Sequence, residues 1–231
     1  VDSYFSATKL QWLLQHVENA SSLLQQGRLC AGNMDAWILW KMSGGKIHST
    51  DGSTASRTML YDVQKQDWAE DLLELFGIPK QIMPTICDSN HVFGNTDSAS
   101  FLGIAAPISG VLNDQQAALL GQGCTMPGKI KTTYGTGCFM FMNTGNYIVD
   151  SQNGILPTVA WRIDGKETYA LDGGVYISGA ATQWLRDGLQ IIEAAADTDA
   201  IASSIDNTNG VYFVPAFTGL AAPYWDSYAR G

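Results

Sequence analysis

The chain has 231 residues, 45% of them hydrophobic, and 13 Lys and Arg against 22 Asp and Glu give it a formal net charge of -9. This length and composition suffice for a packed core, and no apolar run approaches the ~18 residues that a membrane-spanning helix needs. An acidic chain without basic clusters argues against nucleic acid or an anionic membrane as a partner, so small ligands are expected.

The cysteines are well separated and form no C-x-x-C pair, which argues against a zinc site and against a disulfide scaffold. They are Cys30, Cys87, Cys124 and Cys138. Reduced thiols in a cytoplasmic protein are therefore expected. No signal peptide is recognisable, and the first residue is Val1 rather than Met, so we expect the chain to be cut from a longer protein.

The part of the chain before residue 107 is predicted to consist mainly of helices with an apolar stripe. A first helix begins near the N-terminal cap Thr8, and a second runs over residues 34–42 behind the cap Asn33. A third follows a capping-box spacing between Asp67 and Glu70. The tryptophans of the second helix are predicted to lie in the core.

Residues 107–145 carry the most informative pattern of the chain. A short buried strand is predicted over residues 108–112, and Asp114 then opens a helix that Gly121 closes. A carboxylate at the passage from strand to helix lies where open α/β sheets bind their ligands. The alternative is that Asp114 only caps its helix and offsets the helix dipole.

Two strands are predicted over residues 129–134 and 138–143, joined by Gly135-Thr136-Gly137. Glycine permits positive φ and close approach of the backbone. Such a turn can offer amide donors and one hydroxyl to an anion. The alternative is an ordinary hairpin turn without a ligand.

The last third of the chain is predicted to begin with a hairpin of residues 155–163 and 166–171 around Asp164 and Gly165. Gly179 then precedes a helix whose free amides could attract a phosphate, and Gln183 lies one turn further on. The alternative is that Gly179 only allows a tight contact between helix and sheet. A strand is predicted over residues 211–216.

The block NDQQAALLGQGC followed by KTTYGTGCFMFMNTG resembles the glycerol kinases of the FGGY carbohydrate kinase family, within the actin-like, ribonuclease H-like ATPase superfamily. The resemblance includes ASRTML and FTGLAAPYWDSYARG, so it covers essentially the whole chain. It implies an α/β fold of the ribonuclease H-like (actin-like ATPase) class. Residues 1–124 would form the end of the first, substrate-binding domain, and residues 125–231 the beginning of the second, nucleotide-binding domain.

The same resemblance implies that the protein phosphorylates glycerol to glycerol 3-phosphate with ATP. Asp114 would act as general base, and Tyr4 and Gln115 would contact glycerol. Without the resemblance, Tyr4 is explained as well by packing at the entry of the first helix. Thr136 with its turn glycines Gly135 and Gly137 would hold the polyphosphate.

The resemblance further implies that Gly179 and Gln183 touch the nucleotide. Mg²⁺ would be held mostly by phosphates and water, without dedicated protein ligands. The full-length protein is expected to be a homo-oligomer, with glycerol and ATP as ligands and neither nucleic acid nor membrane as a partner.

Several points stay open at this level. The chain corresponds to only a central portion of a glycerol kinase, without the N-terminal phosphate-binding segment, the Arg-Glu pair that grips glycerol or the adenosine pocket, so it is expected to be inactive alone. Asn113 stands where the family commonly has Gly, which leaves reduced activity open. Another FGGY kinase for a pentulose, or a catalytically silent actin-like nucleotide-binding protein, are the alternatives.

Overall fold

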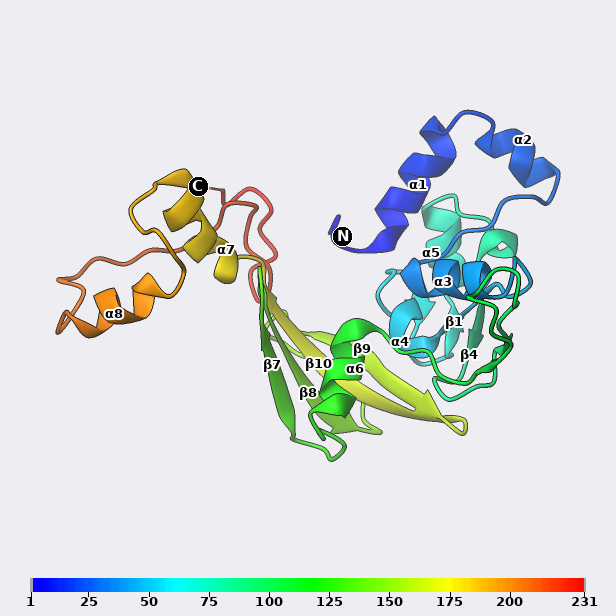
Figure 1. Ribbon diagram of the computed structural model, residues 1–231. Helices are drawn as coiled ribbons and strands as arrows, with labels where there is room; N and C mark the ends of the chain where they lie inside the picture. Colours follow the sequence, from blue (N-terminus) through cyan, green and yellow to red (C-terminus); the bar gives the residue numbers. More distant parts are fainter. Residues whose placement is uncertain (1, 231) are drawn as a thin grey trace.

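The computed structural model describes residues 2–230. An N-terminal part, residues 2–123, is made of short helices and two-stranded sheets, and a C-terminal part is built on one four-stranded antiparallel sheet (Figure 1). Helix α6 lies against this sheet, and α7 and α8 follow it at the far side from the N-terminal part (Figure 1).

The helices of the N-terminal part are α1 (Ser6–His16), α2 (Ala20–Gln25), α3 (Met34–Met42), α4 (Gly52–Ala55), α5 (Glu70–Leu75) and a 3₁₀ turn at Lys80–Ile82. Its strands pair as β1 (Ser49–Asp51) with β4 (Thr85–Cys87) in parallel, β2 (Tyr61–Asp62) with β3 (Asp67–Trp68), and β5 (Gly94–Asn95) with β6 (Pro107–Ile108), the last two pairs antiparallel.

The predicted extent of α3 is confirmed, but neither predicted cap forms a side-chain capping bond. α1 begins at Ser6 behind Phe5, so Thr8 lies inside the helix. Asn33 precedes α3, yet its Oδ1 accepts a hydrogen bond from Ser6 Oγ at 2.8 Å. The Asn33 side chain therefore ties the start of α3 to the start of α1.

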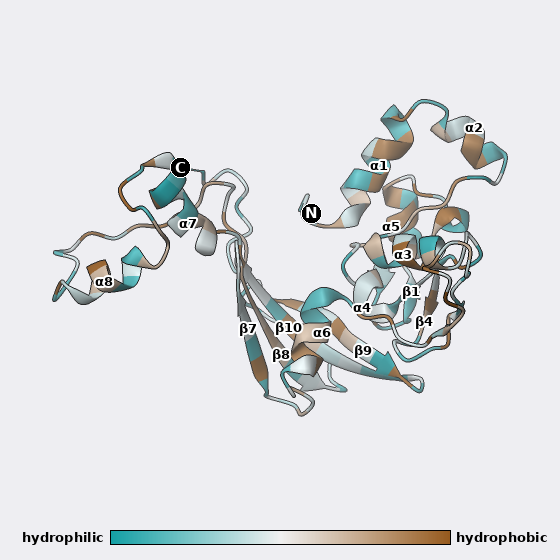
Figure 2. Ribbon diagram, viewed as in Figure 1, coloured by the Kyte–Doolittle hydropathy of each residue, from teal (hydrophilic) through white to brown (hydrophobic). Residues whose placement is uncertain are grey.

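Two further expectations for these helices are wrong. Asp67 lies in β3, and α5 begins behind Ala69 without a side-chain cap, so no capping box forms. Helix α3 is rich in hydrophobic residues (Figure 2), but only Ala36 and Leu39 on one face are buried. Trp37 points away from that face and is 57% exposed.

The strand predicted over residues 108–112 is also wrong, because β6 ends at Ile108. A strand needs a partner strand, and within residues 2–230 the ladder with β5 pairs Pro107 and Ile108 with Asn95 and Gly94 and does not continue into residues 109–112. The helix predicted after it is confirmed as α6 (Asp114–Gly121). A loop rather than a strand therefore leads into Asp114.

The large sheet contains β7 (Ile130–Tyr134), β8 (Cys138–Gly145), β9 (Leu156–Ile163) and β10 (Lys166–Val175) in the order β7-β8-β10-β9, with all neighbours antiparallel. Both predicted hairpins are confirmed. Asp164 and Gly165 have φ of 50° and 73°, as expected for the two-residue turn that matches the twist of its strands.

The chain after the sheet departs further from expectation. α7 (Gly179–Gln183) continues as one π-helical turn at Trp184–Gly188, and α8 covers Asp197–Ser203. The strand predicted over residues 211–216 does not form, and Tyr212 is 89% exposed. An apolar run without a neighbouring strand has no ladder to join.

The β9–β10 hairpin contributes to the core of the N-terminal part. Val159 and Tyr169 pack in one buried cluster with Leu60, Trp68 and Leu73. A second cluster lies between α6 and the sheet and includes, among its buried members, Leu119, Phe141, Ala160, Trp161 and Ala170. The two parts of the chain therefore share buried surface.

All four cysteines are free thiols, as predicted. Over residues 2–230, no helix combines the length and the apolar character that crossing a membrane requires.

Candidate functional site

The start of α6, and with it Asp114, is held by a buried capping arrangement at α4. The Asp51 carboxylate accepts hydrogen bonds from the Thr54 amide at 3.0 Å and from Ser53 Oγ at 2.8 Å. Ser53 Oγ in turn accepts the amide of Asn113 at 2.9 Å. The residue before Asp114 is thereby fixed to α4.

Asn113 adopts an ordinary backbone conformation, with φ of -62° and ψ of 149°. Most residues adopt this region without strain. The backbone conformation therefore does not require a glycine here. Having Asn113 in place of glycine carries no conformational cost for the placement of Asp114.

The α6 helix is fixed to the sheet by Gln116, which has no exposed surface. Its Nε2 donates to the carbonyl of Val159 in β9 at 3.1 Å. Residues on either side of Asp114 are therefore anchored, Asn113 through Ser53 Oγ and Gln116 through the Val159 carbonyl.

Asp114 is exposed, and a line of hydrogen bonds connects it to β7. Gln115 Nε2 donates to Asp114 Oδ2 at 3.1 Å. Lys131 Nζ donates to Gln115 Oε1 and, at 2.9 Å, to Thr133 Oγ1. Among residues 2–230, no hydrogen bond reaches Asp114 Oδ1, so this oxygen is available to a ligand.

Lys131 is a functional candidate that the sequence did not reveal. Only 5% of the residue is exposed, and its Nζ lies 4.9 Å from the centroid of the Phe141 ring. Burial lowers the pKa of Lys131, while the negative charges of Asp114 and Asp172 oppose this change. A lysine in a strand usually faces solvent, so only the three-dimensional register identifies it.

Tyr4 is 43% exposed and belongs to an open group of aromatic rings. Its ring centroid lies 6.4 Å from that of Phe139, nearly parallel at 21°, and 6.1 Å from that of Tyr176. The Arg57 guanidinium lies 5.8 Å from the Tyr4 centroid. Phe139 and Tyr176 were not predicted, because nothing in their spacing separates them from ordinary strand residues.

A buried ion pair lies beneath this aromatic group. Arg57 Nη2 and Asp172 Oδ2 are 2.8 Å apart, and both side chains are almost fully covered. Burial raises the pKa of Asp172, and the guanidinium of Arg57 partly offsets that effect. The pair connects the segment after α4 with β10, so it fixes the Tyr4 surroundings to the sheet.

The turn at 135–137 and Gly179 are brought together, although in a different way from that expected. The carbonyl of Gly135 accepts the Gly179 amide at 2.9 Å, and that of Thr136 accepts the amides of Ser178 and Ala180 at 2.8 and 3.1 Å. The amide of Gly179 is therefore engaged by the turn. The expectation that it is free for a phosphate is wrong.

The turn glycines serve close packing rather than unusual angles. Gly135 and Gly137 are absent from the positive-φ positions of the chain, so that part of the prediction is wrong. A Cβ on Gly137 would lie 2.6 Å from the Val175 carbonyl oxygen, and one on Gly179 would lie 2.6 Å from that of Gly135. The predicted close backbone approach is confirmed.

Two predicted nucleotide contacts keep unengaged polar groups. The Thr136 side chain is exposed, and its hydroxyl makes no hydrogen bond to residues 2–230. Gln183 is the last residue of α7, and it is also exposed. Their roles toward a nucleotide stay predictions.

The two groups of predicted residues meet around β7 and β8. The Phe139 ring, next to Tyr4, also lies 3.2 Å from where a Cβ of Gly137 would be. Along β7, Lys131 and Thr133 share one face, and Gly135 follows about 7 Å further on. Asp114 is connected to β7 through Gln115 and Lys131, and among residues 2–230 no hydrogen bond joins it to the turn.

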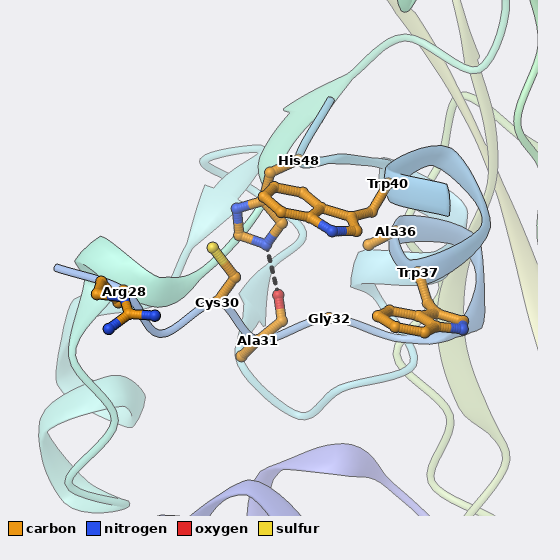
Figure 3. A pocket seen from close by; sticks show the side chains of 8 residues that line it. All are labelled: Arg28, Cys30, Ala31, Gly32, Ala36, Trp37, Trp40 and His48. Carbon is orange, nitrogen blue, oxygen red and sulfur yellow. Dashed lines mark hydrogen bonds between the residues drawn. The ribbon is translucent and has the colours of Figure 1, made fainter. Parts of the chain in front are cut away.

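A separate cavity of about 310 Å³ lies next to α3 (Figure 3). It is lined by Arg28, Cys30, Ala31, Gly32, Ala36, Trp37, Trp40 and His48. His48 Nε2 donates to the carbonyl of Ala31 at 2.7 Å, drawn as a dashed line in Figure 3. None of the predicted site residues lines this cavity.

Within residues 2–230, no group of three or more His, Cys, Asp or Glu side chains is arranged to hold a metal ion. Asp114 is the single carboxylate among the predicted site residues. Mg²⁺ is commonly bound through one or two carboxylates plus substrate phosphates, so this donor set fits a magnesium ion that arrives with a nucleotide.

Comparison with known proteins places both parts of the chain in one family. The N-terminal domain of the FGGY family of carbohydrate kinases matches residues 1–121, and the C-terminal domain of that family matches residues 130–231. A glycerol kinase of Carboxydothermus hydrogenoformans is 54% identical over 231 residues, and glycerol kinase 2 of Thermotoga maritima is 50% identical. The chain is covered completely in both, but it spans only 46% of each relative.

Solved structures agree with this assignment. A Plasmodium falciparum glycerol kinase with ADP superimposes with a TM-score of 0.86 at 35% identity, over 99% of this chain and 46% of that one. A xylulose kinase from Lactobacillus acidophilus gives a TM-score of 0.78 at 20% identity, over 97% of this chain and 45% of that one. The predicted α/β fold of the actin-like ATPase class is confirmed.

Proposed function

Because the chain belongs to the FGGY family of carbohydrate kinases, we propose that it forms the central part of an enzyme that phosphorylates glycerol with ATP. The relatives named glycerol kinase, at 50% identity or more over the whole chain, support this substrate. The observation that carries the proposal is the Asp114 carboxylate, fixed at the start of α6 with Oδ1 unengaged.

Asp114 is assigned the role of general base. Transfer of a γ-phosphoryl group to an alcohol requires that the attacking hydroxyl be oriented and that its proton be accepted. Oδ1 is free to accept this proton, and Oδ2 is held by the Gln115 amide. An exposed but anchored carboxylate suits a base that must meet an incoming substrate.

The remaining predicted residues surround the two substrates. Tyr4 offers an exposed aromatic face, against which the carbon chain of glycerol packs beside Asp114 and Gln115. The Thr136 hydroxyl holds a phosphate oxygen, and Gly179 allows the nucleotide to approach the end of the sheet. Gln183 contacts the nucleotide from α7. When bound, Mg²⁺ offsets the charge on the phosphate oxygens.

The domain boundary near residue 124 is part of the same proposal. The substrate-binding residues Tyr4, Asp114 and Gln115 then come from the first domain, and Thr136 and Gly179 from the second. A homo-oligomeric, cytoplasmic enzyme is the form that we propose for the complete protein.

A chimera tests this function directly. The chain replaces the 231 aligned residues of the Carboxydothermus hydrogenoformans relative, and ATP turnover is measured with glycerol, xylulose and gluconate. Glycerol is expected to give the highest kcat/KM. The Asp114→Asn variant is expected to lower kcat about a hundred- to ten-thousand-fold, because the general base is lost, while KM for ATP stays near that of the unmodified chimera.

The matched control is Asp199→Asn, which alters an exposed first-turn carboxylate of α8 and should leave kcat unchanged. A preference for xylulose would identify a pentulose kinase instead. ATP binding without turnover of any of the three alcohols would identify a nucleotide-binding protein without kinase activity.

A further inference from the structure

We propose that Lys131 is a positioning residue, which sets the orientation of the Gln115 side-chain amide and, through that amide, the carboxylate of Asp114. The proposal rests on the function proposed above, because it assigns a new role within the same site. Its basis is the hydrogen-bond line from β7 to the first turn of α6.

The chemistry of the three side chains allows only one arrangement. An ammonium group has donors and no acceptor, so Lys131 Nζ must face the oxygen end of the Gln115 amide. The nitrogen end then points to Asp114 and donates to Oδ2 at 3.1 Å. A reversed amide would place its oxygen against the carboxylate and its nitrogen against the ammonium, which are both repulsive contacts.

The buried position of Lys131 is costly, so its contacts need an explanation. A buried ammonium requires compensating partners. Lys131 finds them in Gln115, in Thr133 Oγ1 at 2.9 Å and in the face of the Phe141 ring. Each of these partners directs the ammonium to the same place above β7.

Asp172 keeps this region electrically balanced without competing for the Gln115 amide. Its charge acts favourably on Lys131, while its hydrogen-bonded ion pair is with Arg57. The result is a row of alternating charges, from Arg57 through Asp172 and Lys131 to Asp114. Within residues 2–230, Gln115 then holds Oδ2 of Asp114, and Oδ1 accepts no hydrogen bond.

The first test compares Lys131→Met with Lys131→Arg in the chimera. Loss of the donor should raise KM for glycerol roughly tenfold and lower kcat, because Gln115 can rotate and Asp114 loses its fixed orientation. KM for ATP should stay unchanged. Lys131→Arg keeps a cationic donor and should lie closer to the unmodified chimera. The matched control is Lys129→Met, two residues earlier and exposed.

The second test asks whether Lys131 acts through Gln115. Gln115→Leu should impair glycerol use by itself, and adding Lys131→Met should cause little further loss, since the same interaction is already absent. Additive losses in the double variant would mean that Lys131 acts independently of Gln115, and would overturn the proposal. Unchanged glycerol kinetics in Lys131→Met would overturn it as well.

A third measurement separates this inference from the proposed function. If the unmodified chimera shows no turnover, the proposed function fails, and the Gln115 amide can still be observed by NMR with ¹⁵N-glutamine labelling. Its carboxamide signals are identified by their loss in Gln115→Leu. Lys131→Met should shift these signals and leave those of the other glutamines in place, and unshifted Gln115 signals would disprove the positioning role.

Discussion

Asp35 lies in the first turn of α3 and is the residue whose burial has the clearest consequence for stability. Its Oδ2 accepts a hydrogen bond from Thr50 Oγ1 at 2.5 Å, while its Oδ1 is buried without a partner. Burial raises the pKa of Asp35, and the Thr50 bond opposes this rise. The folded state therefore prefers the protonated carboxyl group more than the unfolded state does.

This preference predicts a pH dependence. A carboxyl group with a raised pKa in the folded state stabilises fully below its unfolded value of 3.8, and this stabilisation is lost as pH rises through the folded value. Asp35→Asn removes the titration. The unfolding free energy of the variant, relative to the unmodified chain, should therefore increase between pH 4 and pH 7, as measured from urea midpoints.

Asp71→Asn is the control for this experiment, because Asp71 occupies the first turn of α5 and is exposed. The difference in unfolding free energy between Asp71→Asn and the unmodified chain should stay the same from pH 4 to pH 7. A constant difference for Asp35→Asn would contradict the prediction.

At the scale of elements, the contact between the 135–137 turn and α7 joins the two segments that carry the residues proposed to bind the nucleotide. Three amides from Ser178, Gly179 and Ala180 donate to two carbonyls of the turn. On the α7 side the backbone approach leaves no room for a Cβ, because one on Gly179 would lie 2.6 Å from the Gly135 carbonyl oxygen. The turn and the start of α7 are therefore joined through their backbones.

Gly179→Ala tests this contact. The added Cβ would lie 2.6 Å from the Gly135 carbonyl oxygen, so the turn must shift, at an overpacking cost of about 1–3 kcal/mol. In the chimera, KM for ATP should rise while KM for glycerol is kept. Gly173→Ala in β10 has open space around the new methyl group and should change neither value. An unchanged KM for ATP in Gly179→Ala would argue against a role of this junction in nucleotide binding.

Local signals predicted the elements that are stabilised locally. Helix α3 and the Asp164-Gly165 turn both depend on residues that are close together in the sequence, and both were predicted correctly. The strands expected over residues 108–112 and 211–216 failed because a strand depends on a neighbour elsewhere in the chain. The prediction that Trp37 is buried was wrong because α3 is apolar on more than one side, so its sequence does not show which face packs against the core.

The residues of the candidate site also fall into those that the sequence identified and those that only the structure revealed. Asp114, Gln115 and Thr136 were identified through motifs that resemble a known family. Lys131 and Phe139 were not, because their roles come from strand register, which brings Lys131 against Gln115 and the Phe139 ring against Tyr4.

At the scale of the whole molecule, polar contacts join the N-terminal part to the sheet. Arg57 pairs with Asp172, Asp88 pairs with Arg162 in β9 at 2.5 Å, and the Tyr61 hydroxyl donates to Glu167 in β10 at 2.7 Å. Tyr61 is itself a member of the buried cluster that the two parts share. Disruption of one contact should therefore affect the stability of the whole chain.

Asp172→Ala is predicted to be strongly destabilising, because it leaves the Arg57 guanidinium buried without its partner. Breaking a buried pair on one side costs about 3–5 kcal/mol. The measurement is the urea midpoint of the chain. Asp187→Ala, which breaks the exposed pair of Arg186 and Asp187, should leave the midpoint unchanged. Equal midpoints for the two variants would show that the Arg57 contact does not hold the parts together.

The relatives are about twice as long as this chain, which predicts that the 231 residues alone do not turn over ATP. The chain and the chimera are compared in the same ADP-release assay with glycerol. Turnover should be seen in the chimera only. A rate for the chain equal to that of the chimera would show that the residues described here form a complete active site.

β7 forms one border of the large sheet, with β8 as its sole neighbour among residues 2–230. The outward amides and carbonyls of such a border strand form a template for further backbone hydrogen bonding. Ile130 and Tyr134, both exposed, lie at its two ends. Lateral growth of the sheet at β7 would enclose the strand that carries Lys131 and add backbone hydrogen bonds immediately before the 135–137 turn.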